Sequence, residues 1–348
     1  MIVVVCLNPA LDITHRVPAV NWGGVNRPSL VYARPGGKGL NVARTLHALG
    51  AELLLTGLVG GLTGAGIEAE LGRLGVPAAL TPIAGETRRT FTIADDGGAD
   101  GGTAVTAFNE AGPEVSGREF AAFRGQYAKA LARAEAVVLS GSLPAGLAAR
   151  TYATLIEMAA AAGVPAVLDT HGEALWHGVA AGPAIVKPNL DELENLAGRL
   201  STAHAAHAAY GGDSGDSPDL AAVTIVADQL RILGAQAVVA SLGPHGLLAA
   251  TGDGRWQARP AQVAGNATGA GDAVAAALAH GLVLGRPWDE RLRHAAALGA
   301  ATVAAPVAGE FSVVDYARAL STVTVRRAAA GRGTTLDRDI ALDRDEVS

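Results

Sequence analysis

Residues 265–281, GNATGAGDAVAAALAHG, place small residues and one carboxylate where an apolar, alanine-rich helix is expected to begin. A helix N-terminus presents backbone N–H groups without internal partners and a partial positive charge. Gly269, Ala270 and Gly271 would let a phosphate approach those amides and would form an anion hole. Asp272 could then accept a proton from a hydroxyl that attacks a phosphoryl group. Taken alone, the segment is explained more economically by Asp272 as a helix N-cap.

A second cluster, RPGGKGLNVARTLHALG, occupies residues 34–50. Gly36 and Gly37 allow close backbone approach, and a helix is expected to follow them. Lys38 and Asn41 would face outward near the start of that helix. Backbone amides, an ammonium and a carboxamide together suit a sugar hydroxyl or a phosphate. The alternative is an ordinary strand-to-helix turn with a solvated lysine.

A third cluster, VKPNLDELENL, spans residues 186–196, and its Lys187 and Asn189 end a buried apolar run. Asn189 and Glu192 are three residues apart, which is the spacing of a helix capping box. The functional interpretation is a site for nucleotide phosphate and hydrated Mg²⁺, since this ion usually keeps several of its waters. The pattern allows both interpretations.

A fourth cluster, SLGPHGLL, covers residues 241–248, also at an expected strand end. Ser241, Gly243 and Gly246 belong to it, and the glycines would let a nucleotide lie close to the chain. An ordinary turn explains the segment equally well when it is considered alone.

Several other site types are excluded by the same segments. No lysine follows Gly271, so the segment is not a P-loop, and no third glycine completes a dinucleotide-binding fingerprint. The histidines form no metal-binding pattern, and no Ser-His-Asp arrangement stands out. An NAD-dependent oxidoreductase is therefore excluded.

Composition excludes further classes. The chain has 348 residues, 49% of them hydrophobic and only 4% aromatic, with a net charge of −6. No dense basic run indicates a nucleic-acid surface, and no window is long and apolar enough for a membrane span or a signal peptide. The single cysteine, Cys6, excludes an intramolecular disulfide and fits a reducing cytoplasm. We therefore expect a cytoplasmic protein without nucleic-acid or membrane partners.

Short apolar runs alternate with helical stretches along the chain, which predicts an α/β fold with a mostly parallel sheet covered on both faces. Ligands of such sheets bind beyond the carboxyl ends of the strands, where the four clusters fall. The expected strands are residues 2–7, 136–139, 166–168, 184–186 and 237–240, and the clearest helices are 39–49 and 151–162.

Three other regions follow different patterns. Segments of about 12–34 and 87–108 have β-branched residues broken by glycine and proline, which favours a small separate sheet acting as a lid. Residues 200–219 are typical of a helix end and a loop. Residues 325–348 are charged and poor in large apolar groups, so we expect a loosely attached tail.

The order of the four clusters along the chain is specific. With its clusters in this order, the sequence resembles the PfkB (ribokinase-like) carbohydrate kinase family. PGGKGLNVARTLHALGA is similar to the N-terminal family signature and NATGAGDAVAAALAHGL to the C-terminal one. The resemblance spans about residues 1–320 and implies a three-layer α/β/α sandwich with a small β lid. LNPALD, GGVNR, GETRRTF, NEAGPEV, SGSLPAG and KPNLDEL resemble the 1-phosphofructokinase/tagatose-6-phosphate kinase branch.

The resemblance also implies a role for each matched residue. The residues implied to bind the sugar and its phosphate are Asp12, Gly36, Gly37 and Asn41 for the hydroxyls, Arg27, Lys38 and Arg88 for the phosphate, and Ser142 as a lining residue. The residues implied to serve ATP and Mg²⁺ are Lys187, Asn189, Glu192, Ser241, Gly243 and Gly246, with the ion held through water near Asn189 and Glu192. Asp272 is implied to be the base, and Gly269, Ala270 and Gly271 the anion hole.

These roles imply ATP-dependent phosphorylation of a ketohexose phosphate, foremost fructose 1-phosphate to fructose 1,6-bisphosphate. Tagatose 6-phosphate and fructose 6-phosphate are the alternatives, and a non-catalytic sugar-phosphate or nucleotide-binding regulator is the alternative from another class. A homodimer joined through the lid is one assembly that the resemblance allows.

Two departures from the family pattern concern the same site. Ala267 replaces the usual Asp or Asn before Thr-Gly-Ala-Gly-Asp, which leaves the anion hole intact. Arg89 stands within TRRTF where the branch commonly has Thr-Arg-Ile-Asn. The second change leaves the exact sugar phosphate open.

Overall fold

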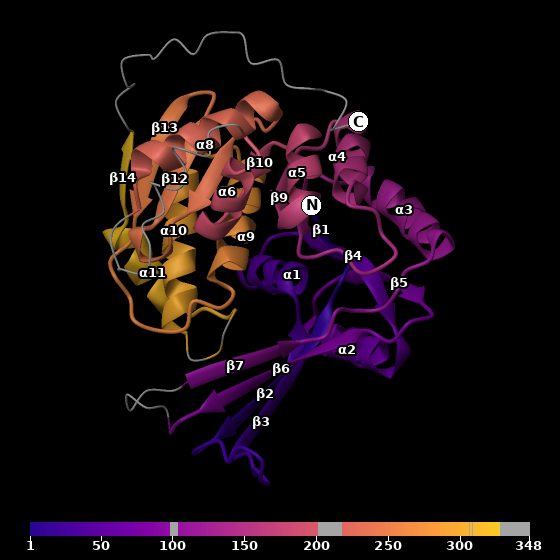
Figure 1. The fold of residues 1–348 in the computed structure, drawn as a ribbon. Helices are drawn as coiled ribbons and strands as arrows, with labels where there is room; N and C mark the ends of the chain where they lie inside the picture. The colour runs from indigo at the N-terminus through magenta and orange to yellow at the C-terminus, as the bar shows by residue number, and fades with distance from the viewer. Residues whose placement is uncertain (98–103, 201–217, 306, 308, 328–348) are drawn as a thin grey trace.

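The computed structural model describes residues 1–97, 104–200, 218–305, 307 and 309–327, and one large sheet forms its centre (Figure 1). The strands of this sheet are β1 (Ile2–Cys6), β4 (Leu53–Gly60), β5 (Ala78–Ile83), β8 (Ala136–Ser140), β9 (Ala166–Asp169), β10 (Ile185–Val186), β11 (Val238–Ser241), β12 (Leu247–Thr251), β13 (Gly254–Arg259) and β14 (Thr324–Arg327). Their order is β14-β13-β12-β11-β10-β9-β8-β1-β4-β5. From β11 to β5 all neighbours are parallel, whereas β12, β13 and β14 extend the sheet with antiparallel pairs.

Helices cover both faces of this sheet. Strand β1 shows why, because its side chains alternate: Val3 and Val5 pack into one buried cluster and Val4 into the other. The first cluster contains residues of α3 (Gly117–Leu131), α4 (Thr151–Ala161), α5 (Gly172–Ala180), α6 (Leu190–Ala197) and α8 (Leu220–Leu233). The second contains residues of α1 (Lys38–Ala48), α2 (Gly61–Leu74), α9 (Ala270–Val283) and α10 (Trp288–Ala304), with α11 (Val313–Thr322) against it. The predicted three-layer sandwich is confirmed.

A second, smaller sheet projects from the larger part of the molecule (Figure 1). Its strands are β2 (Ala10–Val17), β3 (Leu30–Gly36), β6 (Arg88–Asp95) and β7 (Ala104–Asn109), in the order β3-β2-β6-β7. Strand β2 pairs antiparallel with β3 and parallel with β6, and β6 pairs antiparallel with β7. The strands come from the two segments expected to form a lid, so the predicted small sheet is present.

The expectation of a loose tail from residue 325 is wrong for its first residues. Strand β14 continues to Arg327 and pairs with β13, with Val325 opposite Ala258. The apolar Val325 packs against the second core cluster, which the charged composition around it concealed. Residues 328–348 and most of the predicted 200–219 loop lie outside the described residues. Among the described helices, none has both the length and the apolarity needed to cross a bilayer.

Candidate active site

Asp272 lies in the first turn of α9, where the sequence predicted an anion hole. Gly269 is the N-cap, with a left-handed φ of 85°, and Asp272 is the third helical residue with no capping hydrogen bond. The alternative in which Asp272 is only an N-cap is therefore excluded. Its side chain is 6% exposed, and Oδ2 accepts a hydrogen bond of 2.8 Å from Asn41 Nδ2 on α1.

Burial makes Asp272 an unusually weak acid for an aspartate. Burial, with a further contribution from the negative charge of Asp169, raises the pKa of Asp272 to about 7. The hydrogen bond from Asn41 and the charges of Lys38 and Lys187 oppose this shift in the pKa. A carboxyl group with a pKa near neutrality can take up and release a proton under ordinary conditions.

Asp169 is a site residue that the sequence analysis missed. It ends β9, is fully buried, and its Oδ1 lies 3.2 Å from both Lys38 Nζ and Lys187 Nζ. Burial raises the pKa of Asp169, but Lys187 and Lys38 outweigh burial and hold the pKa below its ordinary value. The available signal was the polar residue directly after the apolar run 166–168, at the carboxyl end of a predicted strand.

Lys187 follows the two-residue strand β10 and is 3% exposed. A Cβ built on Gly271 would lie 3.4 Å from Lys187 Nζ, so the ammonium lies against the start of α9. Lys38, at the start of α1, shares Asp169 with Lys187 and also faces Glu192 Oε1 at 3.7 Å. Burial lowers the pKa of Lys38, but the carboxylates of Asp169 and Glu192 outweigh it and hold the pKa above its ordinary value.

Asn189 and Glu192 form the capping box that the spacing allowed. Asn189 Oδ1 accepts from the Glu192 backbone N–H at 2.8 Å, and Glu192 Oε2 accepts from the Asn189 N–H at 2.9 Å. The capping box leaves Glu192 Oε1 for other partners. The cap and a role at the site are therefore compatible.

Glu192 offers one carboxylate oxygen as a ligand for Mg²⁺. Within the described residues, no group of three His, Cys, Asp or Glu side chains is arranged to hold a metal directly. Mg²⁺ binds through one or two carboxylates and retains waters, and Glu192 Oε1 offers such an oxygen. The residues present fit an ion held partly through water, rather than a closed protein cage.

The segment at 241–248 contains the end of β11 and one turn of 3₁₀ helix, Gly243–His245. Ser241 N–H donates to Pro188 O at 2.9 Å, which joins this segment to the Lys187 turn. Gly246 has a φ of 88°, and a Cβ there would lie 2.1 Å from Ala258 O. Packing against β13 therefore accounts for Gly246 without a ligand, whereas Gly243 is exposed and has open space around it.

The β3–α1 turn lies at the junction of the two sheets. Gly37 is the N-cap of α1 with a φ of 92°, and Gly36 is so close to Asp12 that a Cβ would overlap its carboxylate. Asp12 Oδ1 accepts a hydrogen bond of 2.6 Å from Thr90 Oγ1 on β6. Asp12, Gly36, Gly37 and Asn41 are thus brought together at this end of the small sheet.

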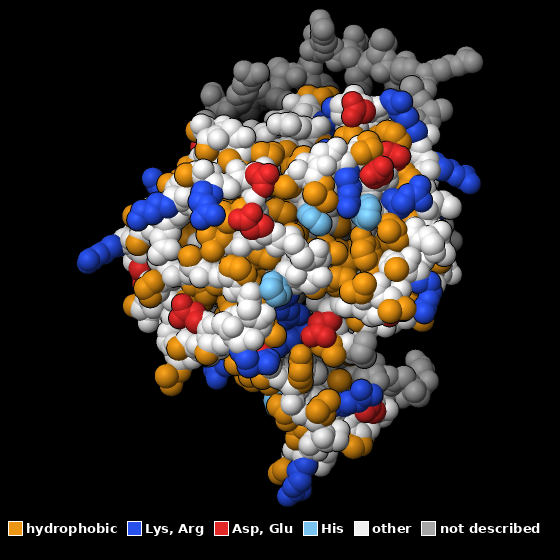
Figure 2. Space-filling view, turned by 180° about the vertical axis from the view of Figure 1, so that it is seen from behind, with side chains coloured by type: hydrophobic (Ala, Val, Ile, Leu, Met, Phe, Trp, Pro, Cys, Tyr) orange, Lys and Arg blue, Asp and Glu red, His pale blue; other side chains and the backbone are white. Residues whose placement is uncertain are grey.

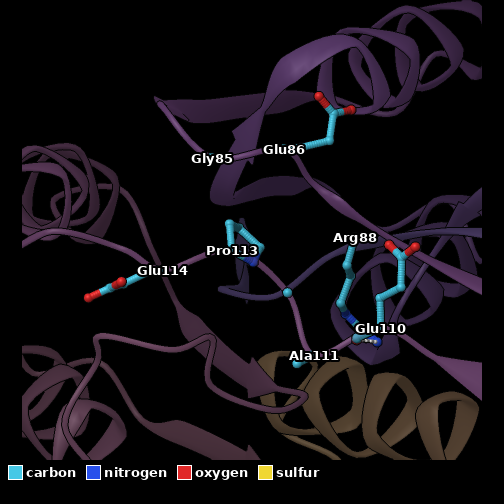
Figure 3. A pocket seen from close by; sticks show the side chains of 8 residues that line it. Gly85, Glu86, Arg88, Glu110, Ala111, Pro113 and Glu114 are labelled. Carbon is cyan, nitrogen blue, oxygen red and sulfur yellow. Dashed lines mark hydrogen bonds between the residues drawn. The ribbon is translucent and has the colours of Figure 1, made fainter.

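Arg88 lines an open pocket of about 440 Å³ next to this junction (Figure 3). Its Nε donates to Asn8 O at 3.2 Å and its Nη1 to Glu110 O at 3.3 Å. Asn8, another residue that the sequence analysis missed, donates from Nδ2 to Ser142 Oγ at 3.1 Å. Ser142 and Arg88 are therefore linked through Asn8. The pocket is lined by Gly85, Glu86, Arg88, Glu110, Ala111, Gly112, Pro113 and Glu114.

Arg27 is not brought to this site within one chain. It is exposed in the segment between β2 and β3, two residues before Ser29, whose N–H donates to Arg16 O. Arg16 lies four positions along β2 from Asp12, so the backbone at Ser29 lies roughly 13 Å along the small sheet from the site. Arg89 pairs at 3.1 Å with Glu110, which also lines the pocket beside Arg88.

Charged side chains gather in the hollow between the small sheet and the larger part of the molecule (Figure 2).

A family model described as pfkB family carbohydrate kinase matches residues 7–313. The chain belongs to the PfkB family of carbohydrate kinases. As a member of this family it is an enzyme that phosphorylates carbohydrates.

Solved structures of PfkB family members and other kinases are similar to this chain. Phosphofructokinase-2 from Escherichia coli, in a complex with potassium, is 27% identical with a TM-score of 0.81, over 92% of this chain and 98% of that one. A possible 1-phosphofructokinase from Thermotoga maritima is 26% identical with a TM-score of 0.78, over 94% and 99%. Arabidopsis thaliana ribokinase is 20% identical with a TM-score of 0.69, over 92% and 98%, and this likeness concerns the fold alone.

Proposed function

We propose that this PfkB family kinase transfers the γ-phosphoryl group of ATP to a hydroxyl of a ketohexose phosphate, foremost fructose 1-phosphate. The observation that carries the proposal is Asp272, a buried carboxylate with a pKa near neutrality beside the amides of a helix N-terminus. Lys187 lies against the same amides. A proton acceptor, an anion hole and a cation together are what phosphoryl transfer to a hydroxyl requires.

In the proposed mechanism the sugar hydroxyl attacks the γ-phosphorus in line, and Asp272 accepts the hydroxyl proton. The Gly269–Gly271 amides and Lys187 stabilise the charge on the transferred group. Lys38 shares Asp169 with Lys187, so it acts on the transferred phosphoryl group rather than on the phosphate already carried by the sugar. Arg88 is left to hold that phosphate, and a guanidinium suits this task.

The nucleotide would lie along the Lys187 turn and the segment that contains Ser241 and Gly243. Gly246 would support that segment through its packing. Mg²⁺, when bound through water near Asn189 and Glu192, would neutralise charge between the phosphates. The small sheet would act as a lid that excludes water and limits ATP hydrolysis.

The choice of fructose 1-phosphate is supported by the branch motifs and by the similar structure described as a possible 1-phosphofructokinase. Phosphofructokinase-2 from Escherichia coli, which is similar to the same extent, favours fructose 6-phosphate as the second candidate. Tagatose 6-phosphate would require the same phosphate contact from Arg88, and it is the third candidate substrate.

An ATP-dependent coupled assay over these three sugar phosphates and their unphosphorylated sugars tests the proposal. We expect turnover with a sugar phosphate, and kcat/KM lowered at least tenfold by Arg88→Ala because a charge-assisted phosphate contact is lost. The matched control is Arg16→Ala, whose side chain pairs with Asp96 at 2.8 Å, away from the pocket that Arg88 lines. An unchanged kcat/KM in Arg88→Ala contradicts the proposal that Arg88 binds the phosphate carried by the sugar. Tight sugar-phosphate binding without any turnover favours the non-catalytic regulator.

A further inference from the structure

Three charged side chains, Arg34, Arg44 and Glu310, join the base of the small sheet to the segment after α10, and we call them the hinge clamp. Arg44 on α1 donates from Nη1 to Pro35 O at 2.9 Å and from Nη2 to Gly309 O at 3.3 Å. Arg34 on β3 has Nη1 3.6 Å from Glu310 Oε1. The proposed mechanism uses none of these three residues.

The hinge clamp reaches the anion hole through Gly309. The Gly309 N–H donates to Thr268 O at 3.0 Å, and Thr268 directly precedes the N-cap Gly269. A Cβ on Gly309 would lie 3.3 Å from Asn41 Oδ1 and 3.6 Å from Arg34 Nη2. Gly309 therefore lies tightly between the sugar side of the site and the start of α9.

Charge balance within the hinge clamp depends on Glu310. Burial lowers the pKa of Arg44, and the nearby positive charge of Arg34 lowers it further, whereas Glu310 opposes both effects. The side chain of Arg34 is 11% exposed and that of Glu310 50% exposed. Neutralising Glu310 would remove one of the groups that offset the repulsion between Arg34 and Arg44 across the β3–α1 turn. It would therefore loosen the connection while leaving the buried groups in place.

We propose that the hinge clamp residues are positioning residues that couple the small sheet to the anion hole. A sugar phosphate that draws the small sheet toward the site fixes Gly309, and with it Thr268 and the α9 N-terminus. The nucleotide then binds more tightly when the sugar phosphate is bound, and the reverse holds by linkage. This inference rests on the proposed function.

The test measures the dissociation constant of a non-hydrolysable ATP analogue by calorimetry, with and without the sugar phosphate that the enzyme turns over. We expect the sugar phosphate to tighten nucleotide binding in the wild type by at least about fivefold. Glu310→Gln should reduce this coupling factor by about two- to fivefold, the effect expected of one partly exposed ion pair. The affinity for each ligand alone should stay within about twofold of the wild type.

A conservative variant and a matched control make the result specific. Glu310→Asp keeps the negative charge that faces Arg34 and should retain most of the coupling. Arg16→Gln removes another ion pair of the small sheet, Arg16–Asp96 at 2.8 Å, and should leave the coupling unchanged. Glu310 is exposed enough for Glu310→Gln to fold, and thermal unfolding of each variant verifies this.

Two results would overturn the inference in an active enzyme: no coupling in the wild type, or full coupling in Glu310→Gln. Equal loss in Arg16→Gln would also overturn it, because the effect would then belong to any charge on the small sheet. Absence of turnover with every sugar phosphate contradicts the proposed function instead. The turnover assay therefore separates the two failures.

Discussion

At the scale of single residues, two buried carboxylates of the same site have pKa values shifted in opposite directions. Asp169 contacts two lysines and is held ionised, whereas Asp272 lies beside Asp169 and has a pKa of about 7. Pairs of titratable groups separated in this way indicate which group exchanges a proton. Asp169 then keeps the lysines in place, and Asp272 remains available to the substrate hydroxyl.

Replacing Asp272 tests its assignment as the base. Asp272→Asn should lower kcat by about 10²- to 10⁴-fold, the range typical of general-base catalysis, with KM changed by less than about threefold. Stability should not fall, because Gly269 rather than Asp272 occupies the N-cap position. Steady-state kinetics and calorimetric binding of the sugar phosphate measure both effects. A kcat near that of the wild type would exclude Asp272 as the base.

The dependence of the rate on pH tests the same residue without removing it. Proton transfer requires ionised Asp272, so kcat should fall about tenfold for each pH unit below about 7 and level off above it. Asp169→Asn removes a negative charge that raises the pKa of Asp272, so the acid limb should move to lower pH. Profiles of kcat for both proteins over pH 5 to 9 measure this shift. If the acid limb of the kcat profile stays in place in Asp169→Asn, that limb reports a group other than Asp272.

At the scale of elements, the site is assembled from the carboxyl ends of β9, β10 and β11 and from the N-termini of α1, α6 and α9. Three of the four motifs found in the sequence contain the start of one of these helices, whereas the fourth, residues 241–248, is the turn between β11 and β12. The capping box of α6 illustrates how local structure and function combine, since Glu192 caps the helix with Oε2 and faces Lys38 with Oε1.

Two substitutions in this capping box should separate its structural and functional roles. Asn189→Ala removes the cap and should lower the free energy of unfolding by about 1 kcal/mol. Glu192→Gln keeps an acceptor for the Asn189 N–H but loses the charge, so stability should change by less than about 0.5 kcal/mol while the Mg²⁺ concentration needed for half-maximal rate rises. Urea unfolding and Mg²⁺ titrations of the rate measure the two effects. An unchanged Mg²⁺ requirement would leave Glu192 with the capping role alone.

The elements were easier to predict than the contacts between them. Apolar runs such as 136–139 and 237–240 became β8 and β11, since a short continuous apolar run is typical of a strand buried on both faces. Asp169 escaped prediction because one polar residue at the end of a four-residue strand is a weak local signal. Its role arises only when Lys38 and Lys187, from two other elements, converge on it.

The hinge clamp was equally hidden in the sequence. Arg44 and Gly309 are 265 residues apart, and their contact depends on the packing of α1 beside α9. The prediction that the tail begins at residue 325 was wrong for a related reason. Strand β14 is held by its pairing with β13, a long-range contact that local composition does not indicate.

At the scale of the whole molecule, the small sheet exposes several large apolar side chains. In the part of the chain that the structure describes, exposed apolar side chains lie on this sheet and on the connection between β2 and β3. They are Trp22, Val25, Leu30, Val31, Val105 and Phe108. Such a surface favours a protein partner. We propose a second copy of this chain, because Arg27 lies in the same exposed region, beyond the end of β2 that is farther from Asp12.

Mixing two inactive variants tests this homodimer and the role of Arg27 together. If Arg27 serves the site of the other copy, Arg27→Ala and Asp272→Asn chains refolded together form mixed dimers with one complete site each. Activity should then rise to roughly a quarter of the wild-type rate, because half of the dimers are mixed and each has one of its two sites intact. Arg88→Ala mixed with Asp272→Asn is the matched control and should recover nothing, since Arg88 lies at the site of its own chain. Sedimentation establishes the assembly in each mixture. A monomeric protein, or equal recovery of activity in the two mixtures, would contradict a site shared between two copies. The apolar surface of the small sheet would then bind a different partner.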